Sequence, residues 1–203
     1  MAPRLILIGF MATGKSATGR ALAARLGWQL IDLDRLIADR TGKPIAAIFA
    51  EVGEARFREI EHEVISELAQ RDLRCPLCGQ PRPMIISPGG GALIDQRNQT
   101  ALSGMGLIIC LTARVDVIAA RVRRAREPRP KLMEGGLPLE QRIRQLMEER
   151  REIYARADIT IDTSERTIEQ VVDTILAAIT NTWREKVKMP DRRIADGNEM
   201  NRS

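Results

Sequence analysis

The chain is poor in cysteine, aromatic residues and long apolar runs, and each shortage excludes a class of protein. Three cysteines among 203 residues are too few for the disulfide framework of a small secreted protein. Aromatic residues make up 3% of the sequence, so a core has to be built from Ala, Leu, Ile and Val. No apolar run approaches the ~20 residues of a membrane-spanning helix, and the N-terminus lacks the features of a secretory signal. We therefore expect a cytoplasmic protein with reduced thiols.

Length and charge fit one domain that binds small anions. A chain of 203 residues, 44% of them hydrophobic, suits a single α/β domain better than two. The net charge is +5, from 32 Lys and Arg against 27 Asp and Glu. This modest excess fits the binding of anionic metabolites and does not require nucleic acid as a partner.

Short apolar, β-prone runs alternate with helical patterns along the chain. Strands are expected over 5–8, 28–32, 84–87, 107–111 and 159–162. Helices are expected over 16–26, 34–41, 45–52, 54–70, 96–103, 114–125 and 138–155. A last helix follows a capping box of Thr167 and Gln170 and carries one apolar face, made of Ile168, Val171, Val172, Ile175 and Ile179. The alternation predicts a three-layer α/β/α fold with a central parallel sheet over residues 1–180, followed by a polar tail over 181–203.

The segment from Gly9 to Ser16 fits a phosphate-binding loop. It reads Gly-Phe-Met-Ala-Thr-Gly-Lys-Ser and matches the pattern G-x-x-x-x-G-K-[ST]. Glycines let backbone N–H groups turn toward phosphate oxygens, and the following helix directs the positive end of its dipole at the same place. Lys15 can reach the β- and γ-phosphates, and the Ser16 hydroxyl can bind Mg²⁺. The motif follows an apolar strand and opens a helix, and this context favours a nucleotide site over a chance glycine turn.

Asp32 and Asp34 lie at the end of the second predicted strand. Residues two apart in an extended chain point the same way, so both carboxylates are expected to face a crevice beyond the carboxyl ends of the strands. One would hold a water on Mg²⁺, and the other would accept a hydrogen bond from an attacking substrate hydroxyl. The alternative is a helix N-cap with a solvated Asp beside it.

Two further motifs offer groups for an acidic substrate. Arg58 and Glu61 share a helix face, either as a surface ion pair or as a clamp in which Glu61 orients the guanidinium toward a carboxylate. Their spacing leaves both interpretations open. Three glycines, 89–91, follow the third predicted strand, either as a tight loop or because backbone N–H groups approach a ligand closely.

Taken in order, the motifs at 9–20, 32–34, 57–61 and 89–91 resemble the shikimate kinase family. Arg129-Pro130 is similar to that family's lid arginine, and Arg150 with Tyr154 is similar to its late substrate-binding arginine segment. The likeness covers about residues 4–180. It implies a P-loop, nucleoside-monophosphate-kinase-like fold with a lid at about 122–136. The activity it implies is transfer of the γ-phosphoryl of ATP to the 3-hydroxyl of shikimate.

The resemblance also implies a role for each matching residue. Catalysis would involve Lys15, Asp34 and Arg129. The nucleotide would be bound by Ala12, Thr13, Gly14, Lys15, Ser16, Ala17 and Arg129. Shikimate would be bound by Asp34, Arg58, Gly89, Gly90, Gly91 and Arg150. Mg²⁺ would be bound by Ser16 and, through water, by Asp32. The expected partners are ATP and shikimate, with neither nucleic acid nor membrane, and the protein is expected to be a monomer.

Basic residues crowd the region of the predicted lid, namely Arg121, Arg123, Arg124, Arg126, Arg129 and Lys131. No aromatic residue interleaves with them, so the base stacking of single-strand binders is not expected. A lid over the ATP phosphates is favoured, with a solvated face as the alternative for Arg121 and Arg123. Lys131 adds a charge where the family usually has Leu.

The predicted loop at about 71–83 is longer than the family's usual connection and contains Cys75 and Cys78. A structural zinc site needs four ligands, and the sequence has no second cysteine pair. The single histidine, His62, is expected on the surface of the Arg58 helix. Ordinary thiols are favoured, with a metal site or a redox pair as alternatives.

Two other functions stay open. A related kinase for gluconate or another small hydroxy acid would share the phosphate-binding loop. A module that binds ATP or nucleic acid without catalysis is the second alternative, and the presence of Lys15, Ser16, Asp32 and Asp34 argues against it.

Overall fold

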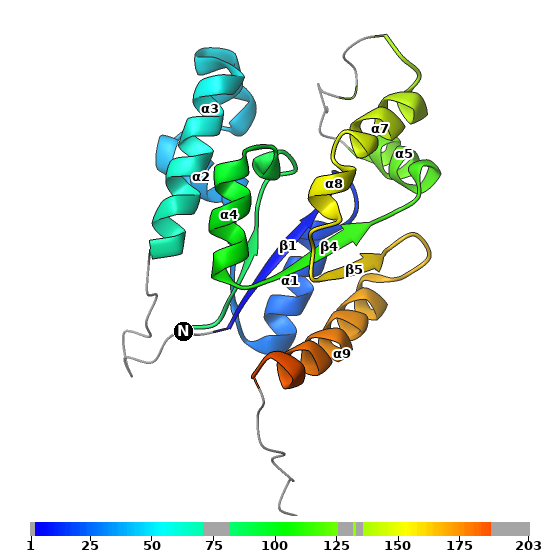
Figure 1. The fold of residues 1–203 in the computed structure, drawn as a ribbon. Coiled ribbons are helices and arrows are strands. Elements are labelled where there is room, and N and C mark those ends of the chain that lie inside the picture. The colour runs from blue at the N-terminus through cyan, green and yellow to red at the C-terminus, as the bar shows by residue number, and fades with distance from the viewer. Residues whose placement is uncertain (1–2, 71–81, 126–131, 133–135, 188–203) are drawn as a thin grey trace, which may run out of the picture.

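Five parallel strands form the central layer of the protein (Figure 1), in the order β2-β3-β1-β4-β5. The computed structural model describes residues 3–70, 82–125, 132 and 136–187, with side chains as far as Thr180. The strands are β1 (Arg4–Gly9), β2 (Gln29–Asp32), β3 (Met84–Ser87), β4 (Leu107–Thr112) and β5 (Ile159–Asp162). All five predicted strands are thus confirmed, and so is the parallel sheet.

Helices cover both faces of this sheet because its strands are apolar on both sides. Alternate residues of β1 point in opposite directions, so Leu5 and Leu7 belong to one core and Ile6 and Ile8 to the other. The Leu5 face is covered by α1 (Lys15–Leu26) and α9 (Ile168–Val187). The Ile6 face is covered by α2 (Leu33–Thr41), α3 (Ile45–Gln70) and α4 (Gln96–Met105). This is the predicted three-layer architecture.

A third, smaller core lies beyond the end of β4. It joins Phe10, at the beginning of the phosphate-binding loop, to α5 (Val115–Arg124) and α7 (Leu139–Glu148). The short helix α8 (Arg151–Tyr154) lies between this core and α4 in Figure 1. The beginning of the phosphate-binding loop is therefore packed against α5 and α7 as well as joined to the sheet.

The predicted helix boundaries and the predicted apolar face of the last helix agree with the structure only in part. The helix predicted over 138–155 is broken into α7 and α8, with Arg150 at φ −109° and ψ 4° between them. The predicted break at Gly53 is confirmed, because its φ of 75° and ψ of 172° separate the two helical stretches that share the label α3. The capping box is present, with Thr167 N donating to Gln170 Oε1 and Gln170 N to Thr167 Oγ1, at 2.9 and 3.2 Å. Ile168, placed on the apolar face, is 39% exposed because it lies in the first turn, outside the packed part of α9.

Some predicted features fall outside the described residues. These are the lid arginine Arg129, Lys131, the cysteines Cys75 and Cys78, and the segment 188–203. The backbone of α9 continues past the expected boundary at 180 to Val187. No helix within the described ranges is long and apolar enough to cross a membrane.

Candidate active site

A cavity of about 320 Å³ lies at the carboxyl ends of β1, β2 and β3. Parallel strands end at the same edge of a sheet, so this edge gathers the segments that follow them. The lining comes from the phosphate-binding loop, from the start of α2 and from the glycine loop after β3. Its residues include Lys15, Ser16, Ala17, Asp32, Asp34, Gly89 and Gly90. The fold thus brings together motifs that the sequence places far apart.

The phosphate-binding loop has a backbone that most side chains would not allow. Gly9 and Gly14 have φ angles of 139° and 97°, and Ala12 also has a positive φ of 62°. A β-carbon at Gly9 would collide with the carbonyl oxygen of Leu111 on the neighbouring strand β4. Glycine is therefore required at position 9 for two reasons, namely its positive φ and the short distance between β1 and β4.

Lys15 lies at the first position of α1 and curls back over the loop. Its Nζ donates to the carbonyl oxygens of Gly9 and Phe10, at 2.8 and 2.9 Å. Ser16 and Ala17 follow in the first turn of the helix, whose positive end faces the cavity. This arrangement offers backbone N–H groups, a hydroxyl and an ammonium group to one anion.

The loop is held from outside by two residues whose role the sequence did not reveal. Arg121, on α5, donates from Nη1 to the carbonyl of Ala12 at 3.2 Å, and from Nη2 to the carbonyl of Thr163 at 2.7 Å. The Thr163 hydroxyl in turn donates to the carbonyl of Thr13 at 3.0 Å. The solvated face considered for Arg121 is therefore wrong. It does describe Arg123, which makes an exposed ion pair with Glu140.

Asp32 and Asp34 both line the cavity, as predicted, but the extended geometry expected for the pair is wrong, because Asp32 ends β2 and Asp34 lies in the first turn of α2. Asp32 also accepts a hydrogen bond from the backbone N of Arg35 at 3.3 Å, so it caps α2 while facing the crevice. The Asp34 carboxylate opens into the crevice, where solvent still reaches it. Burial by the crevice walls, followed by the charge of Asp32, raises the pKa of Asp34, and the cations Lys15 and Arg58 oppose this rise.

Arg58 and Glu61 form a shielded ion pair, with 2.7 Å between Arg58 Nη1 and Glu61 Oε2. The Glu61 side chain is 1% exposed, and burial raises its pKa to about 7, with Arg58 opposing the rise. The guanidinium also pairs with Glu54 and lies 5.4 Å from the centre of the Phe57 ring. The surface-pair interpretation of these two residues is therefore wrong.

The glycine loop packs directly against these charged groups. A β-carbon at Gly89 would lie 2.6 Å from Asp34 Oδ1 and 3.2 Å from Glu61 Oε1, and one at Gly91 would overlap the Arg58 guanidinium. Gly90 differs, because its nearest neighbour would be Met11 N at 4.0 Å. A side chain at Gly89 or Gly91 would therefore displace the Asp34 carboxylate or the Arg58 guanidinium, so these two glycines leave the charged groups in place.

Arg150 approaches the same loop from the other side. It is 5% exposed, donates from Nη1 to the carbonyl of Gly90 at 2.7 Å and lies over the ring of Phe10. The break between α7 and α8 occurs at this residue, which lets its side chain reach the glycine loop. Arg58 and Arg150 thus lie against adjacent residues of one loop, although the sequence separates them widely.

Metal-binding and histidine expectations can also be compared with the structure. Within the described ranges, no three His, Cys, Asp or Glu side chains are grouped as a metal site. Cys110 is a buried thiol, and burial raises its pKa to about 11. His62 is half-buried and hydrogen-bonded to Asn98, so its expected surface position is wrong.

Known protein families provide an independent comparison. The family model described as shikimate kinase matches residues 11–180. A shikimate kinase of Geobacter sulfurreducens is 42% identical over 171 residues, which cover 84% of this chain and 87% of the relative. One of Salinibacter ruber is 39% identical over 183 residues, covering 87% and 84% of the two chains.

Solved structures give the same result. The shikimate kinase of Acinetobacter baumannii in complex with shikimate has a TM-score of 0.76 at 31% identity, covering 90% of this chain and 95% of that one. The enzyme of Bacteroides thetaiotaomicron has a TM-score of 0.75 at 30% identity, with 88% and 98% covered. A gluconokinase of Sinorhizobium meliloti, 15% identical with a TM-score of 0.55, shares the fold alone.

Proposed function

This chain belongs to the shikimate kinase family of ATP-dependent phosphotransferases, and we propose that its crevice transfers the γ-phosphoryl of ATP to the 3-hydroxyl of shikimate. The observation that carries this proposal is the convergence of three groups at one sheet edge. The phosphate-binding loop, the Asp34 carboxylate and the glycine loop between two arginines all meet there. A small hydroxylated carboxylate needs this combination of groups.

The phosphate-binding loop would hold the donor. Ala12 and residues 14–17 line the cavity with their backbone and with the Ser16 hydroxyl, and Lys15 already lies over the loop. On nucleotide binding, Lys15 Nζ would exchange its carbonyl partners for phosphate oxygens and stabilise charge on the transferring group.

Asp34 would act on the acceptor. Its carboxylate opens into the cavity that Lys15 and Ser16 also line, so a hydroxyl bound beside it would face the γ-phosphoryl. Its raised pKa makes it a better proton acceptor than an ordinary aspartate. The hydroxyl proton would move to Asp34 as the oxygen attacks phosphorus.

Arg58, Arg150 and the glycine loop would hold the acceptor's carboxylate and ring. Arg58 is oriented by Glu61, and Arg150 by the carbonyl of Gly90. A guanidinium that is already fixed loses less entropy when it binds a carboxylate. The space beside Gly90 would accommodate the ring of the acceptor, and a residue with a side chain at this position would fill that space.

Mg²⁺ fits the oxygen donors of the crevice. Ser16 and Asp32 line the same cavity, and this metal typically binds through one or two protein oxygens, waters and substrate phosphates. When bound with ATP, it would neutralise phosphate charge. Arg129, outside the described residues, remains a predicted lid residue over the nucleotide.

A coupled assay of ADP release tests this function. With ATP and Mg²⁺, we expect turnover with shikimate that exceeds turnover with gluconate or quinate by at least about a hundredfold, because the arginine clamp and Asp34 act together on one acceptor. Identification of shikimate 3-phosphate by ³¹P NMR would confirm the product. Turnover with gluconate and none with shikimate would overturn the assignment of the acceptor.

A further inference from the structure

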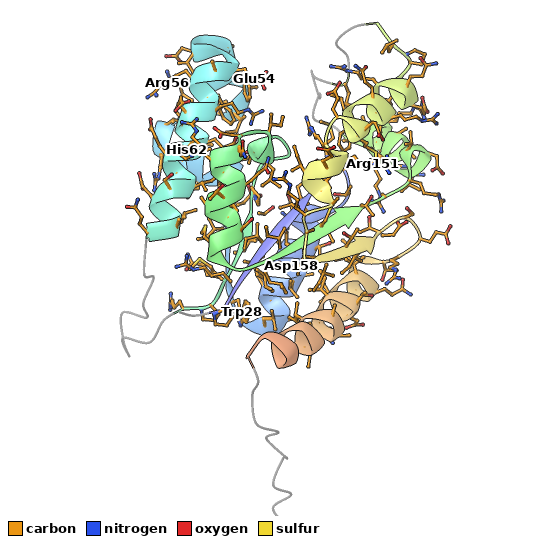
Figure 2. The ribbon with its side chains drawn as sticks, viewed as in Figure 1. Trp28, Glu54, Arg56, His62, Arg151 and Asp158 are labelled. Atoms are coloured by element: carbon orange, nitrogen blue, oxygen red, sulfur yellow. The ribbon has the colours of Figure 1, made fainter. Side chains whose placement is uncertain are left out.

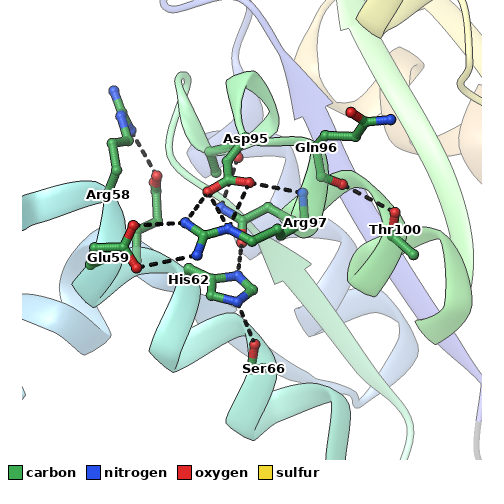
Figure 3. Close-up of polar contacts among 11 residues, drawn as sticks. Arg58, Glu59, His62, Ser66, Asp95, Gln96, Arg97 and Thr100 are labelled. Carbon is green, nitrogen blue, oxygen red and sulfur yellow. Dashed lines mark hydrogen bonds and ion pairs between the residues drawn. The ribbon is translucent and has the colours of Figure 1, made fainter. Parts of the chain in front are cut away.

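We propose that His62 and Asn98 are positioning residues for the acceptor site, because they link the helix that carries Arg58 to the glycine loop. This inference rests on the proposed function, since it concerns how that site is held. Neither residue lines the cavity. Figure 3 shows His62 on the side of α3 that faces the beginning of α4.

Asn98 has a fixed orientation inside the protein. It is fully buried, and its Nδ2 donates to the carbonyl of Ala92 at 2.9 Å. Because that bond uses the amide nitrogen, the oxygen Oδ1 is the atom that faces His62 Nδ1 at 2.8 Å. His62 must therefore carry a proton on Nδ1 and donate it to Asn98.

The second ring nitrogen of His62 contacts its own helix. With the proton on Nδ1, Nε2 accepts from Ser66 Oγ, 3.4 Å away. The bond to Ser66 stays within α3, so the bond to Asn98 is the one that joins two elements.

Both ends of this link reach the acceptor site. His62 lies one helical turn after Arg58, so the two side chains share a face of α3. Ala92, at the other end, begins the short helix η1 (Ala92–Ile94) directly after the glycine loop, and its N donates to the carbonyl of Gly89 at 3.1 Å. The link from His62 through Asn98 to Ala92 thus fixes how α3 lies against residues 89–91.

The close packing at the loop makes this placement consequential. The Arg58 guanidinium rests on Gly91, and Glu61 approaches Gly89, so that a β-carbon at Gly91 would force the guanidinium to shift. A small shift of α3 would change where the guanidinium lies, and so how it meets a carboxylate. A second link between the helices, from Arg97 to Glu59, is about half exposed and contributes less.

The test compares variants that differ only in the Nδ1 donor. His62→Asn keeps a donor nitrogen at the position of Nδ1, whereas His62→Leu removes it at similar volume. We expect His62→Leu and Asn98→Leu each to raise KM for shikimate about tenfold, with KM for ATP within about twofold of wild type, because loss of one partner leaves the other buried and unpaired. His62→Asn should recover most of the loss. Ser66→Ala, on the outer side of the ring, is the matched control and should resemble wild type.

A double variant and hydrogen exchange distinguish a failure of this inference from a failure of the proposed function. His62→Leu with Asn98→Leu should be no worse than either alone, because the two residues act as one link. Exchange of the Ala92 amide should be faster in His62→Leu, a readout that does not depend on the acceptor. Equal rises in both KM values, an unchanged KM for shikimate, or no recovery in His62→Asn would overturn the inference. Inactive wild type with shikimate would instead overturn the proposed function, and the exchange rates would still test the link.

Discussion

Glu61 illustrates at the scale of one residue how orientation and stability oppose each other. Its Oε2 pairs with Arg58, but within the described part of the chain its buried Oε1 has no hydrogen-bond partner. The nearby charges of Asp34 and Asp95 add to the burial. A carboxylate in this environment helps to aim Arg58 at the expense of folding free energy.

Replacing Glu61 with Gln should make stability less dependent on pH. The pKa of this carboxyl is about 7 in the folded protein and near 4.5 when unfolded, so the folded state binds the proton more tightly. Its contribution to stability is therefore full below pH 4.5 and is lost as pH rises toward 7. Relative to wild type, Glu61→Gln should gain on the order of 1–3 kcal/mol between pH 5 and pH 8. Urea unfolding at both pH values measures this gain.

The same variant should lose activity at pH 8, above the pKa of Glu61, because Arg58 is no longer oriented by a carboxylate. We expect KM for shikimate to rise several-fold, with KM for ATP little changed. A Glu61→Gln protein whose stability advantage is equal at pH 5 and pH 8 would show that the carboxyl titrates normally in the folded state.

The three glycines of the loop after β3 should differ sharply in their tolerance of a methyl group. A β-carbon at Gly89 would lie 2.6 Å from the Asp34 carboxylate, whereas one at Gly90 meets nothing closer than 4.0 Å. Neither glycine has a positive φ, so backbone strain does not confuse the comparison. Gly89→Ala should lose about 1–3 kcal/mol of stability. Gly90→Ala should keep the wild-type thermal midpoint and raise KM for shikimate. A lowered midpoint in Gly90→Ala would contradict this assignment.

What the sequence reveals at this scale depends on the type of contact. Lys15 and Ser16 belong to a local motif whose chemistry determines its spacing, so they can be identified without a structure. Thr163 and Arg121 act on backbone carbonyl groups, which every residue possesses, and no pattern in the sequence marks the partner. Asn98 is hidden for the same reason, because its contact with Ala92 is also to a carbonyl.

At the scale of elements, α5 supports the phosphate-binding loop through Arg121 as well as through the third core. Arg121 links the Ala12 carbonyl to Thr163, in the loop after β5. Arg121→Ala should raise KM for ATP about tenfold and leave KM for shikimate nearly unchanged, because it releases the donor side of the crevice. Arg123→Ala, on the same helix and in an exposed ion pair, is the matched control with no expected effect. Equal effects of both changes would favour a general role of positive charge.

Helix breaks were the least predictable elements. The apolar periodicity of 138–155 continues through Arg150, so it indicates one helix where the structure has two. The break follows from a tertiary requirement, since the buried guanidinium at Arg150 has to reach the carbonyl of Gly90. At Gly53, by contrast, the residue type itself marks the change in dihedral angles.

At the scale of the whole molecule, β1 belongs to both cores. Ile6 and Leu7 are adjacent, fully buried and directed to opposite faces of the sheet. Ile6→Ala and Leu7→Ala should each lower the free energy of unfolding by about 2–5 kcal/mol. Far-UV circular dichroism and tryptophan fluorescence should still give one coincident urea transition, because neither face can lose its support alone. Trp28, at the amino end of the sheet (Figure 2), packs on the Leu7 side and is one of the two tryptophans that report on the transition. Separate transitions would show that the two faces unfold independently.

The three-layer architecture could be predicted from the sequence more completely than any single element or contact. Strands such as 84–87 and 107–111 are short apolar runs between turns, and their alternation with helices leaves few possible topologies. The order of the strands cannot be read in the same way, since it depends on which strand pairs with β1. That order places β3 beside β1 and so brings the glycine loop next to the phosphate-binding loop.

The central position of β1 also has a consequence for how such a protein can diverge. On one side of it, the segments that follow β2 and β3 supply every group proposed for the acceptor except Arg150, with Asp34 on α2, Arg58 on α3 and the glycine loop after β3. On the other side, β4 and β5 lead to the segments that support the phosphate-binding loop. Gene duplication followed by mutation of α2, α3 and the glycine loop can therefore alter the choice of acceptor while the machinery for ATP is inherited unchanged. Arg150 is the exception, since it crosses from the donor half. A lineage that changes its acceptor has to alter residues in both halves of the gene if the new molecule carries no carboxylate.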